Sequence, residues 1–227
     1  MGIKTIEFWA QGTTPLLINR ATEEALLGGG GIRANTPGER IDPRDAAEKV
    51  VYRLDNPLQW GGPKTVARQL YFVGAGVARA VCEAGGIHKA KGSRKALKWL
   101  VPAAMTVMTE KMPIFLNDRK TPVVEYEVYS VPVIIPATKG RVMRHRPRVN
   151  EWTIRCELLI KDHIISEDTI RMLVNEALQQ QGLGDWRPNC RGSFGISDLV
   201  SWRVISEQKK KTEAQAFAAG EMPEAAE

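Results

Sequence analysis

Cysteine is scarce in this sequence, and its spacing excludes two classes of small protein. The 227 residues include three cysteines, Cys82, Cys156 and Cys190. An odd number of widely spaced cysteines fits neither a disulfide framework nor a zinc knuckle. We therefore expect a cytoplasmic protein in a reducing compartment, with Cys82 and Cys156 as small core residues.

Histidines and cofactor motifs are also sparse. The three histidines, His88, His145 and His163, form neither an HxH nor an HExxH pattern, so no histidine metal site is expected. No glycine-rich stretch continues into the Gly-Lys-Ser/Thr of a Walker A motif. Residues 74–80 resemble a Rossmann fingerprint only superficially, because we expect them inside a helix with no strand before them. The sequence predicts no metal and no cofactor. No pair of a nucleophile and a base can be identified in the sequence, so we expect a protein that is not an enzyme.

Long hydrophobic runs are missing as well. No apolar stretch approaches the ~20 residues that a membrane-spanning helix needs. The N-terminal residues lack the apolar core of a secretory signal and are typical of a strand. We therefore expect no membrane partner.

The charge of the chain is positive and unevenly distributed. Formal net charge is +6 and the sequence pI is near 9.3. The segment from Glu213 to Glu227 contains four glutamates and no base, so the rest of the chain is more basic than the total suggests. A basic balance is in itself only a weak indication of an anionic partner.

Hydrophobic periodicity in the first half predicts one strand and several helices. Alternation predicts a strand over residues 3–10, followed by an apolar segment over 15–20. The four consecutive glycines at 28–31 predict a loop. Asp42 and Pro43 are a typical N-cap and first helical residue. Apolar residues at helical spacing predict a longer helix over 64–83 and a short one over 93–100.

The second half is richer in strand signals. Short and long strands are expected at 114–116 and 123–135, and Pro132 places the longer one at a sheet edge or a bend. Clean alternation predicts a strand over 151–160, with Trp152, Ile154, Cys156, Leu158 and Ile160 on its inner face. A helix capped by Ser166 and ended by Gly182 then precedes a final strand over 196–204. The residues expected on the inner face of that strand are Ile196, Val200, Trp202 and Val204.

The order of these elements indicates an α+β fold. Strand, helices, strands, helix and strand match a ferredoxin-like (RRM-like) antiparallel sheet of β-α-β-β-α-β order. We expect a single domain over residues 1–205, with a helical insertion at about 42–101 and a C-terminal glycine-rich loop. Residues 206–227 are polar and alanine-rich, which predicts a disordered or frayed acidic tail.

Residues 182–195, called the glycine loop below, are the most informative segment. Four glycines, two arginines and two aromatic residues share this one connection. Glycine permits close backbone approach to a partner, arginine supplies a planar cation, and rings supply stacking faces. We expect Trp186, Arg187, Arg191 and Phe194 to contact a nucleic-acid backbone or its bases. Alternatively, Trp186 packs on the domain and an internal Asp185–Arg187 pair locks the loop.

Residues 139–148, called the arginine strand, contain five strong bases and no acid. The bases are Lys139, Arg141, Arg144, Arg146 and Arg148. If the segment is extended, Arg144, Arg146 and Arg148 lie on one face about 7 Å apart. This spacing resembles that of phosphates in a stretched single strand, and we expect nucleic-acid contact. The alternative is a solvated edge strand protected by its charge.

Residues 88–99, called the lysine cluster, form a second basic segment. Its five strong bases, again without an acid, are Lys89, Lys91, Arg94, Lys95 and Lys98. Positive charge at a predicted helix start opposes the helix dipole, and a bound phosphate would relieve both. The alternative is a solvated helix face.

A helix, then Gly182-Leu183-Gly184 to Gly192-Ser193-Phe194-Gly195, then a C-terminal strand resembles the RAMP superfamily. That ferredoxin-like group includes CRISPR effector backbone subunits and repeat-processing endoribonucleases. The resemblance covers residues 152–204 directly and the rest by element order. Gly12-Thr13-Thr14-Pro15-Leu16-Leu17 also looks like the opening of small phage and prophage proteins. The resemblance implies RNA or single-stranded DNA held along a basic groove, by subunits that assemble into a homo-oligomer or filament in a bacterial or phage-infected cell.

These observations together predict a non-catalytic, cytoplasmic protein that binds single-stranded nucleic acid. Two alternatives remain open at this point. One is a metal-independent endoribonuclease that uses His145 or His88 as its base. The other is a phage-type structural or inhibitory protein whose basic segments face an acidic protein partner.

Overall fold

The computed structural model describes residues 2–21, 42–90, 92, 94–134 and 140–209. The predictions for the glycine run at 28–31, for Lys91 and Lys139, and for residues 210–227 of the expected tail lie outside these residues. The first four residues of that tail, 206–209, are strand rather than disordered, because they pair with residues 2–5. The elements are β1 (Gly2–Gly12), β2 (Leu16–Leu17), α2 (Pro43–Lys49), β3 (Tyr71–Val73), α3 (Gly74–Ala84), η1 (Leu97–Trp99), α4 (Val101–Ala104), β4 (Met105–Val107), β5 (Lys111–Phe115), β6 (Glu127–Ile134), β7 (Arg141–Val149), β8 (Thr153–Lys161), α5 (Glu167–Glu176), η2 (Ala177–Gln181), η3 (Pro188–Cys190) and β9 (Ser197–Lys209).

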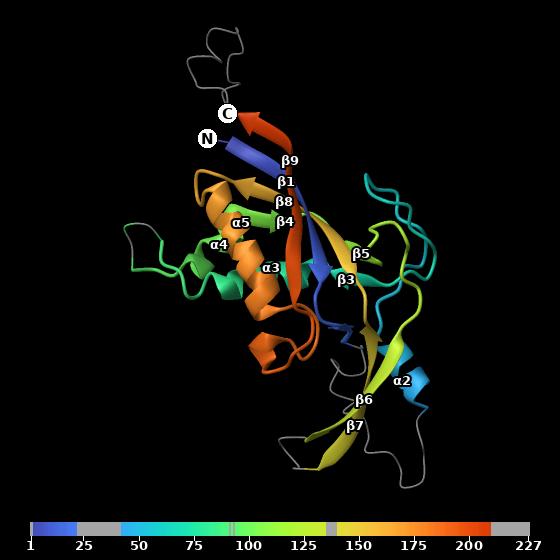
Figure 1. Cartoon of the computed structure of the whole chain (residues 1–227). Coiled ribbons are helices and arrows are strands. Elements are labelled where there is room, and N and C mark those ends of the chain that lie inside the picture. The colour runs from blue at the N-terminus through green and yellow to red at the C-terminus, as the bar shows by residue number, and fades with distance from the viewer. Residues whose placement is uncertain (1, 22–41, 91, 93, 135–139, 210–227) are drawn as a thin grey trace, which may run out of the picture.

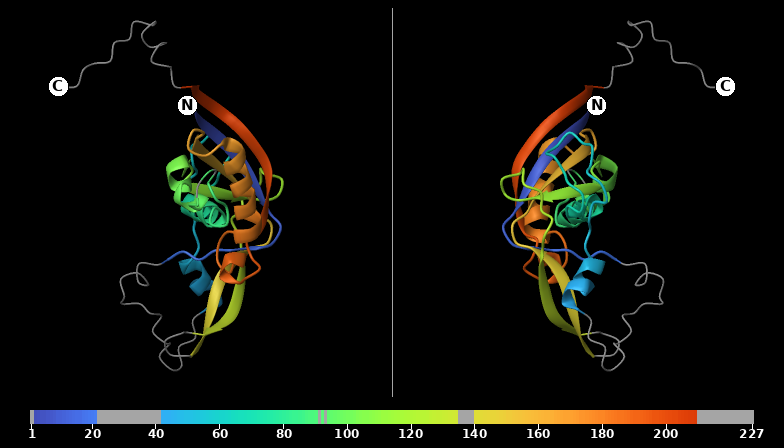
Figure 2. Two further views of the ribbon diagram at one scale, coloured as in Figure 1. Left: turned by 90° about the vertical axis from the view of Figure 1, so that its left-hand side faces the viewer. Right: turned by 90° about the vertical axis from the view of Figure 1, so that its right-hand side faces the viewer.

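The larger of the two described sheets has the strand order β3-β5-β8-β1-β9, and β4 also pairs with β8. All of these pairings are antiparallel. Because α3 lies between β1 and β4 in sequence, and α5 lies between β8 and β9, the β-α-β-β-α-β order expected from the sequence is present. The helices α3, α4 and α5 cover one face of this sheet (Figure 2). Among the described residues, no helix is long and apolar enough to cross a membrane.

The core lies between this sheet and the helices. On β8 the predicted inner residues Ile154, Cys156, Leu158 and Ile160 are all fully buried, as is the preceding Trp152. On the neighbouring β1, Ile6, Phe8 and Ala10 are equally buried. The strict alternation of both strands therefore predicted their buried faces correctly.

The helix expected over 64–83 is wrong in its first half. Residues 71–73 form β3, which pairs with β5, and α3 begins only at Gly74. Before β3 the chain is an irregular segment whose backbone is held by the buried Gln69 side chain. A strand therefore leads directly into the Gly74–Ala80 segment, contrary to expectation. A Cβ on Gly74 would lie 2.2 Å from the Thr109 carbonyl oxygen, so this glycine is required by packing.

Two further predictions are corrected. In the region of the helix expected over 93–100, the described residues form only the short η1, and Lys89 forms an isolated bridge with Ala96 instead. In β9 the register against β1 shifts at Trp9/Ala10 and again at Thr5/Ile6. Leu199 thereby takes the core-facing place, while Val200 and Val204, expected inside, are 38% and 43% exposed. The shift at Trp9/Ala10 leaves Val200 without a register partner on β1, as a β-bulge does. Val204 keeps the inner register opposite Ile6, on the edge strand β9.

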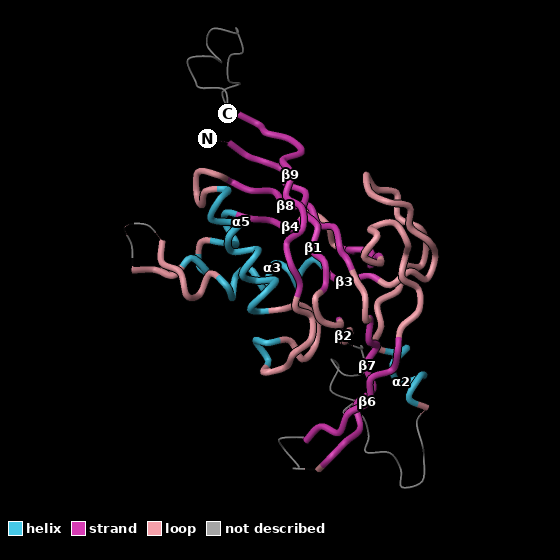
Figure 3. Tube along the Cα trace, viewed as in Figure 1, coloured by secondary structure: helices cyan, strands magenta, loops and turns pink. Residues whose placement is uncertain are grey.

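The smaller described sheet has the order β2-β7-β6. Its β6–β7 hairpin projects from the main body beside α2 (Figure 1, Figure 3). Pro132 lies on β6, which is an edge strand as predicted. The helix α2 has its expected cap, since the Asp42 carboxylate accepts the Arg44 N–H at 2.7 Å.

Candidate functional site

The glycine loop is docked between the two sheets by backbone hydrogen bonds. Asp185 N–H donates to the Leu17 carbonyl at 2.9 Å, and Gly195 N–H donates to the Pro15 carbonyl at 2.8 Å. The loop is closed on itself by a 2.9 Å bond from Leu183 N–H to the Gly195 carbonyl. Because Pro15 and Leu17 precede or form β2, these bonds fix the loop beside the small sheet.

The close approaches that require glycine are internal to the protein. A Cβ on Gly195 would lie 1.8 Å from the Leu183 carbonyl oxygen, where the backbone φ is +71°. A Cβ on Gly192 would lie 1.8 Å from the Trp186 carbonyl oxygen. The expected approach of glycine backbone to a partner is therefore replaced by approach to the chain's own carbonyls, which shape the loop.

The arginine strand is β7, and its register separates its bases onto two faces. Arg144, Arg146 and Arg148 pair with Val131, Tyr129 and Glu127 of β6 and lie on one face, as expected. Arg141 pairs with Ile134 on the opposite face. The structure therefore brings three of the predicted arginines together and leaves Arg141 apart from them.

The hairpin and the glycine loop are joined by an ion pair and by edge-on contacts between aromatic rings. The Arg146 Nε–H donates to the Asp185 carboxylate at 2.9 Å. The Tyr129 ring packs edge-on against Trp186 at 6.1 Å and against Phe194 at 5.2 Å between centroids. Trp186 and Phe194 are half-buried by these contacts. The aromatic residues expected to meet a ligand are thus also part of the joint between loop and hairpin.

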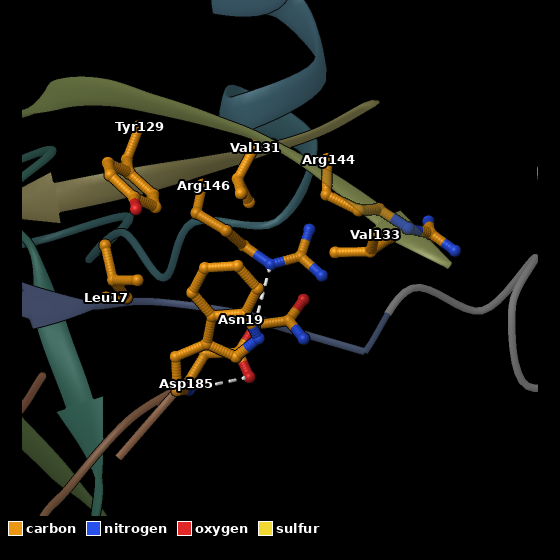
Figure 4. Close-up of a pocket in the computed structure, with 9 residues that line it drawn as sticks. Leu17, Asn19, Tyr129, Val131, Val133, Arg144, Arg146 and Asp185 are labelled. Carbon is orange, nitrogen blue, oxygen red and sulfur yellow. Dashed lines mark hydrogen bonds and ion pairs between the residues drawn. The ribbon is translucent and has the colours of Figure 1, made fainter. Parts of the chain in front are cut away.

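A pocket of about 190 Å³, called the hairpin pocket, lies at this joint (Figure 4). It combines side chains from β6 and β7 with side chains from the end of β2 and from the glycine loop. The residues that line it are Leu17, Asn19, Tyr129, Val131, Val133, Arg144, Arg146, Asp185 and Trp186. Among the described residues, Arg144 has no hydrogen-bond or ion-pair partner. Its guanidinium is therefore available to an anionic ligand.

A second pocket of about 350 Å³, called the loop pocket, adjoins the first. Asn19 and Asp185 line both pockets, so the two are adjacent, and together they are called the cleft. The loop pocket is lined by Asn19, Tyr52, Phe72, Val73, Ala75, Gly76, Arg79, Gly182, Leu183, Gly184, Asp185 and Arg187. Burial raises the pKa of Tyr52 above its ordinary value, which already lies above neutral pH, so its neutral phenol can donate or accept a hydrogen bond.

Charge in the cleft is strongly biased. Arg144 and Arg146 line the hairpin pocket, and Arg79 and Arg187 line the loop pocket. Asp185 is the one acidic side chain among the described residues that line either pocket. A cleft lined by cations with low-dielectric walls favours anionic ligands.

Other predicted site residues lie outside the cleft. Arg191 is exposed in the left-handed conformation, and Phe194 packs on Tyr129 without lining either pocket. Arg148 lies on the same face of β7 as Arg144 and Arg146. Its Nε is buried and has no hydrogen-bond partner among the described atoms. The described bases of the lysine cluster, Lys89, Arg94, Lys95 and Lys98, are exposed. Figure 1 shows their segment, which leads into α4, well away from β6 and β7.

The sequence did not identify most of the residues that line the cleft, including the polar side chains of Asn19, Tyr52, Arg79 and Tyr129. Asn19 follows β2, and its position depends on the pairing of β2 with β7. Tyr129 lies at the pocket because it is paired in register with Arg146 on the neighbouring strand. The signal that could have found Tyr129 is the strand alternation of 123–135, which places it on one face with Val131 and Val133.

The histidines that a nuclease would need lie elsewhere. His145 is hydrogen-bonded to Ser130 Oγ at 2.7 Å, on the hairpin face opposite to Arg144 and Arg146. His88 is paired with Glu176 of α5 at 2.6 Å. Neither histidine lines either pocket.

The fold and cleft define an α+β protein whose cationic cleft lies between a hairpin and a glycine-rich loop. No protein-family model matches the chain, and no curated protein matches it. The chain is similar in fold to a chain of the type III-B Cmr-beta bound to cognate target RNA, at a TM-score of 0.47 and 12% identity, over 90% of this chain and 61% of that one. It is also similar to Cmr6 from Pyrococcus furiosus, at a TM-score of 0.44 and 8% identity, over 88% and 98% of the two chains. A third similar structure is a chain of a type IV-B CRISPR complex, at 0.43 and 10% identity, over 89% and 90%.

The chain spans 61% of the length of the first of these three similar chains.

Proposed function

We propose that this chain is a non-catalytic protein that binds single-stranded nucleic acid in the cleft formed by the hairpin and loop pockets. The observation that supports this most is the junction of the arginine strand with the glycine loop. Arg144 and Arg146 come from one, and Asp185 and Trp186 come from the other. The sequence predicts basic contacts in both segments and aromatic contacts in the glycine loop, and Arg144, Arg146 and Trp186 line the same pocket.

The chemistry of the cleft suits a flexible polyanion. Arginines on both pockets can neutralise successive phosphates, and binding of this kind releases counterions. Trp186, Tyr129 and Tyr52 add rings, against which bases of a single strand can stack. A duplex hides its bases in the stack and cannot use these rings, so we expect a preference for single strands.

The resemblance to the RAMP superfamily adds two elements to this proposal. In that group the ligand is RNA or single-stranded DNA, and subunits often assemble along it. We propose that residues 182–195 correspond to the glycine-rich loop of the group and that copies of this chain assemble on a bound strand. Size-exclusion chromatography with and without oligonucleotide tests the assembly. We expect a larger species only when the oligonucleotide is present.

The absence of catalysis is also part of the proposal. His145 faces away from Arg144 and Arg146, and His88 is engaged with Glu176, so neither is positioned to act on a strand bound in the cleft. Structured RNA incubated with the protein in EDTA should stay intact on a denaturing gel. Discrete cleavage products would support the endoribonuclease alternative instead.

The binding itself is tested by fluorescence anisotropy. Labelled single-stranded RNA, single-stranded DNA and duplex of one sequence are titrated with the protein at a low and a moderate salt concentration. We expect single strands to bind more tightly than duplex, with affinity that falls as salt rises. If no oligonucleotide binds at low salt, the proposed function is wrong.

A further inference from the structure

On the basis of the function proposed above, we infer that the hairpin pocket receives one unstacked nucleobase of the bound strand. Its size supports this assignment. The volume of the pocket is about 190 Å³. Pockets for drug-sized ligands and cofactors begin at about 300 Å³. The hairpin pocket by itself therefore has the size for a single planar ring system, and the sugar and phosphate of that nucleotide would lie outside it.

The walls of the pocket suit a flat, mostly apolar group. Val131 and Val133 of β6 line one side, and Leu17 of β2 lines another. The Tyr129 and Trp186 rings also line the pocket and are fixed edge-on to each other at 6.1 Å. Because these two rings brace one another, they are held in place before any ligand arrives, which lowers the entropy cost of binding.

Asn19 supplies a hydrogen-bonding group that no described residue uses. Its side chain is exposed, and among the described residues it has no hydrogen-bond partner. Figure 4 shows Asn19 at the same cavity as Arg144 and Arg146. The amide offers a donor and an acceptor side by side, which is the pattern that pairs with the edge of adenine.

The arginines complete the arrangement at the edge of the pocket. A base is linked through its sugar to a phosphate, so a base pocket needs a cation within reach of its entrance. Arg144 lines this pocket without a partner among the described residues, whereas Arg146 is held by Asp185. We therefore assign the phosphate contact to Arg144 and the base edge to Asn19.

The test compares an oligoadenylate with an oligomer of the same length and backbone whose residues are abasic. Both carry the same phosphates, so only contacts to bases distinguish them. Anisotropy titrations are made with the full chain, with Asn19→Ala, and with Asn189→Ala as the matched control. Asn189 is exposed in the glycine loop and lines neither pocket. Arg144→Ala serves as the variant that alters phosphate contact.

We expect the wild-type protein to bind oligoadenylate about five- to a hundredfold more tightly than the abasic oligomer. Asn19→Ala should weaken binding of oligoadenylate about two- to tenfold and leave binding of the abasic oligomer unchanged. Asn189→Ala should change neither, and Arg144→Ala should weaken both.

Two other results would contradict different parts of this proposal. If Asn19→Ala leaves both affinities unchanged, or lowers both equally, the base pocket is overturned while the proposed function stands. If the wild-type protein binds neither oligomer at low salt, the proposed function itself fails.

Discussion

Arg146 and Asp185 join the hairpin to the glycine loop through a 2.9 Å hydrogen bond between the Arg146 Nε and the Asp185 carboxylate. Both side chains are largely buried, at 16% and 28% exposed. The sequence suggested an internal pair between Asp185 and Arg187 instead. In the structure Arg187 donates to the Gly184 carbonyl at 2.9 Å, which leaves Asp185 free for Arg146. Asp185, the one acidic side chain among the described residues that line the cleft, is thus paired with Arg146, one of the four arginines that line it.

Replacement of Asp185 by asparagine should strengthen nucleic-acid binding. The change removes negative charge from the cleft and releases Arg146 for a phosphate. The backbone bond from residue 185 to Leu17 remains, so the loop stays docked. We expect a gain of up to about fivefold at low salt, because partly exposed ion pairs of this kind are worth little.

Asp198→Asn is the matched control for that experiment. Asp198 accepts a hydrogen bond from Gln179 and lines neither pocket, so its replacement changes net charge equally. Anisotropy titrations should show a gain for Asp185→Asn that Asp198→Asn lacks. Equal gains would mean that net charge alone controls binding.

The glycine loop gives a prediction about stability. Gly195→Ala places a Cβ 1.8 Å from the Leu183 carbonyl oxygen at a φ of +71°. Gly92 has the same φ of +71° with no atom within 4 Å of its Cβ position, so Gly92→Ala tests backbone strain alone. We expect Gly92→Ala to cost about 1–2 kcal/mol of unfolding free energy and Gly195→Ala to cost about 1–3 kcal/mol more. Urea unfolding measures both, and equal losses would contradict the account of the loop.

Several helices and strands could be predicted from the sequence because the spacing of their apolar residues fits only one kind of element. The alternation of residues 151–160 and the helical spacing after Ser166 specified β8 and α5. The segment that became β3 was misread because Leu70, Val73 and Val77 also fit a helix. Pairing with β5 decided between the two readings, and pairing is a long-range contact that a local pattern does not contain.

On the outer face of the main sheet, too, a local sequence pattern did not predict which side chains are buried. Arg155 alternates with apolar residues on β8 and by pattern belongs in solvent, yet it is 4% exposed. The Trp60 ring, far away in sequence, lies 4.9 Å from its guanidinium carbon, and Glu7 and Glu157 accept hydrogen bonds from its Nε and Nη2. In the cleft, likewise, the arginines and Trp186 were predicted, whereas Asn19 and Tyr129 depended on strand register.

Stability at acidic pH should depend on Glu48, which binds α2 to its surroundings. The Glu48 carboxylate accepts hydrogen bonds from Arg53 at 2.5 Å and from the Tyr126 hydroxyl at 2.7 Å. The hydrogen bond from Arg53 is the largest cause that lowers the pKa of Glu48 from 4.5 to about 2. Because the folded pKa is depressed, this stabilisation is present above about 4.5 and is lost as pH falls toward about 2.

Glu48→Gln should therefore flatten the loss of stability over that pH interval. The control is Glu125→Gln, since the Glu125–Arg44 pair is largely exposed and should contribute little. Urea midpoints measured across the interval distinguish the two variants. A Glu48→Gln protein whose midpoint falls with pH as steeply as the wild type would contradict this assignment.

The most direct test of the cleft is the salt dependence of binding in two arginine variants of the same strand. Arg144 lines the hairpin pocket, and Arg141 lies on the opposite face of β7. Anisotropy titrations of single-stranded RNA over a range of salt give the slope of log affinity against log salt concentration for each protein. We predict that Arg144→Ala reduces the magnitude of this slope by about 0.7, as expected for one lost phosphate contact on a single strand, and that Arg141→Ala leaves it unchanged. Equal slopes in the two variants would contradict the location of the nucleic acid in the cleft.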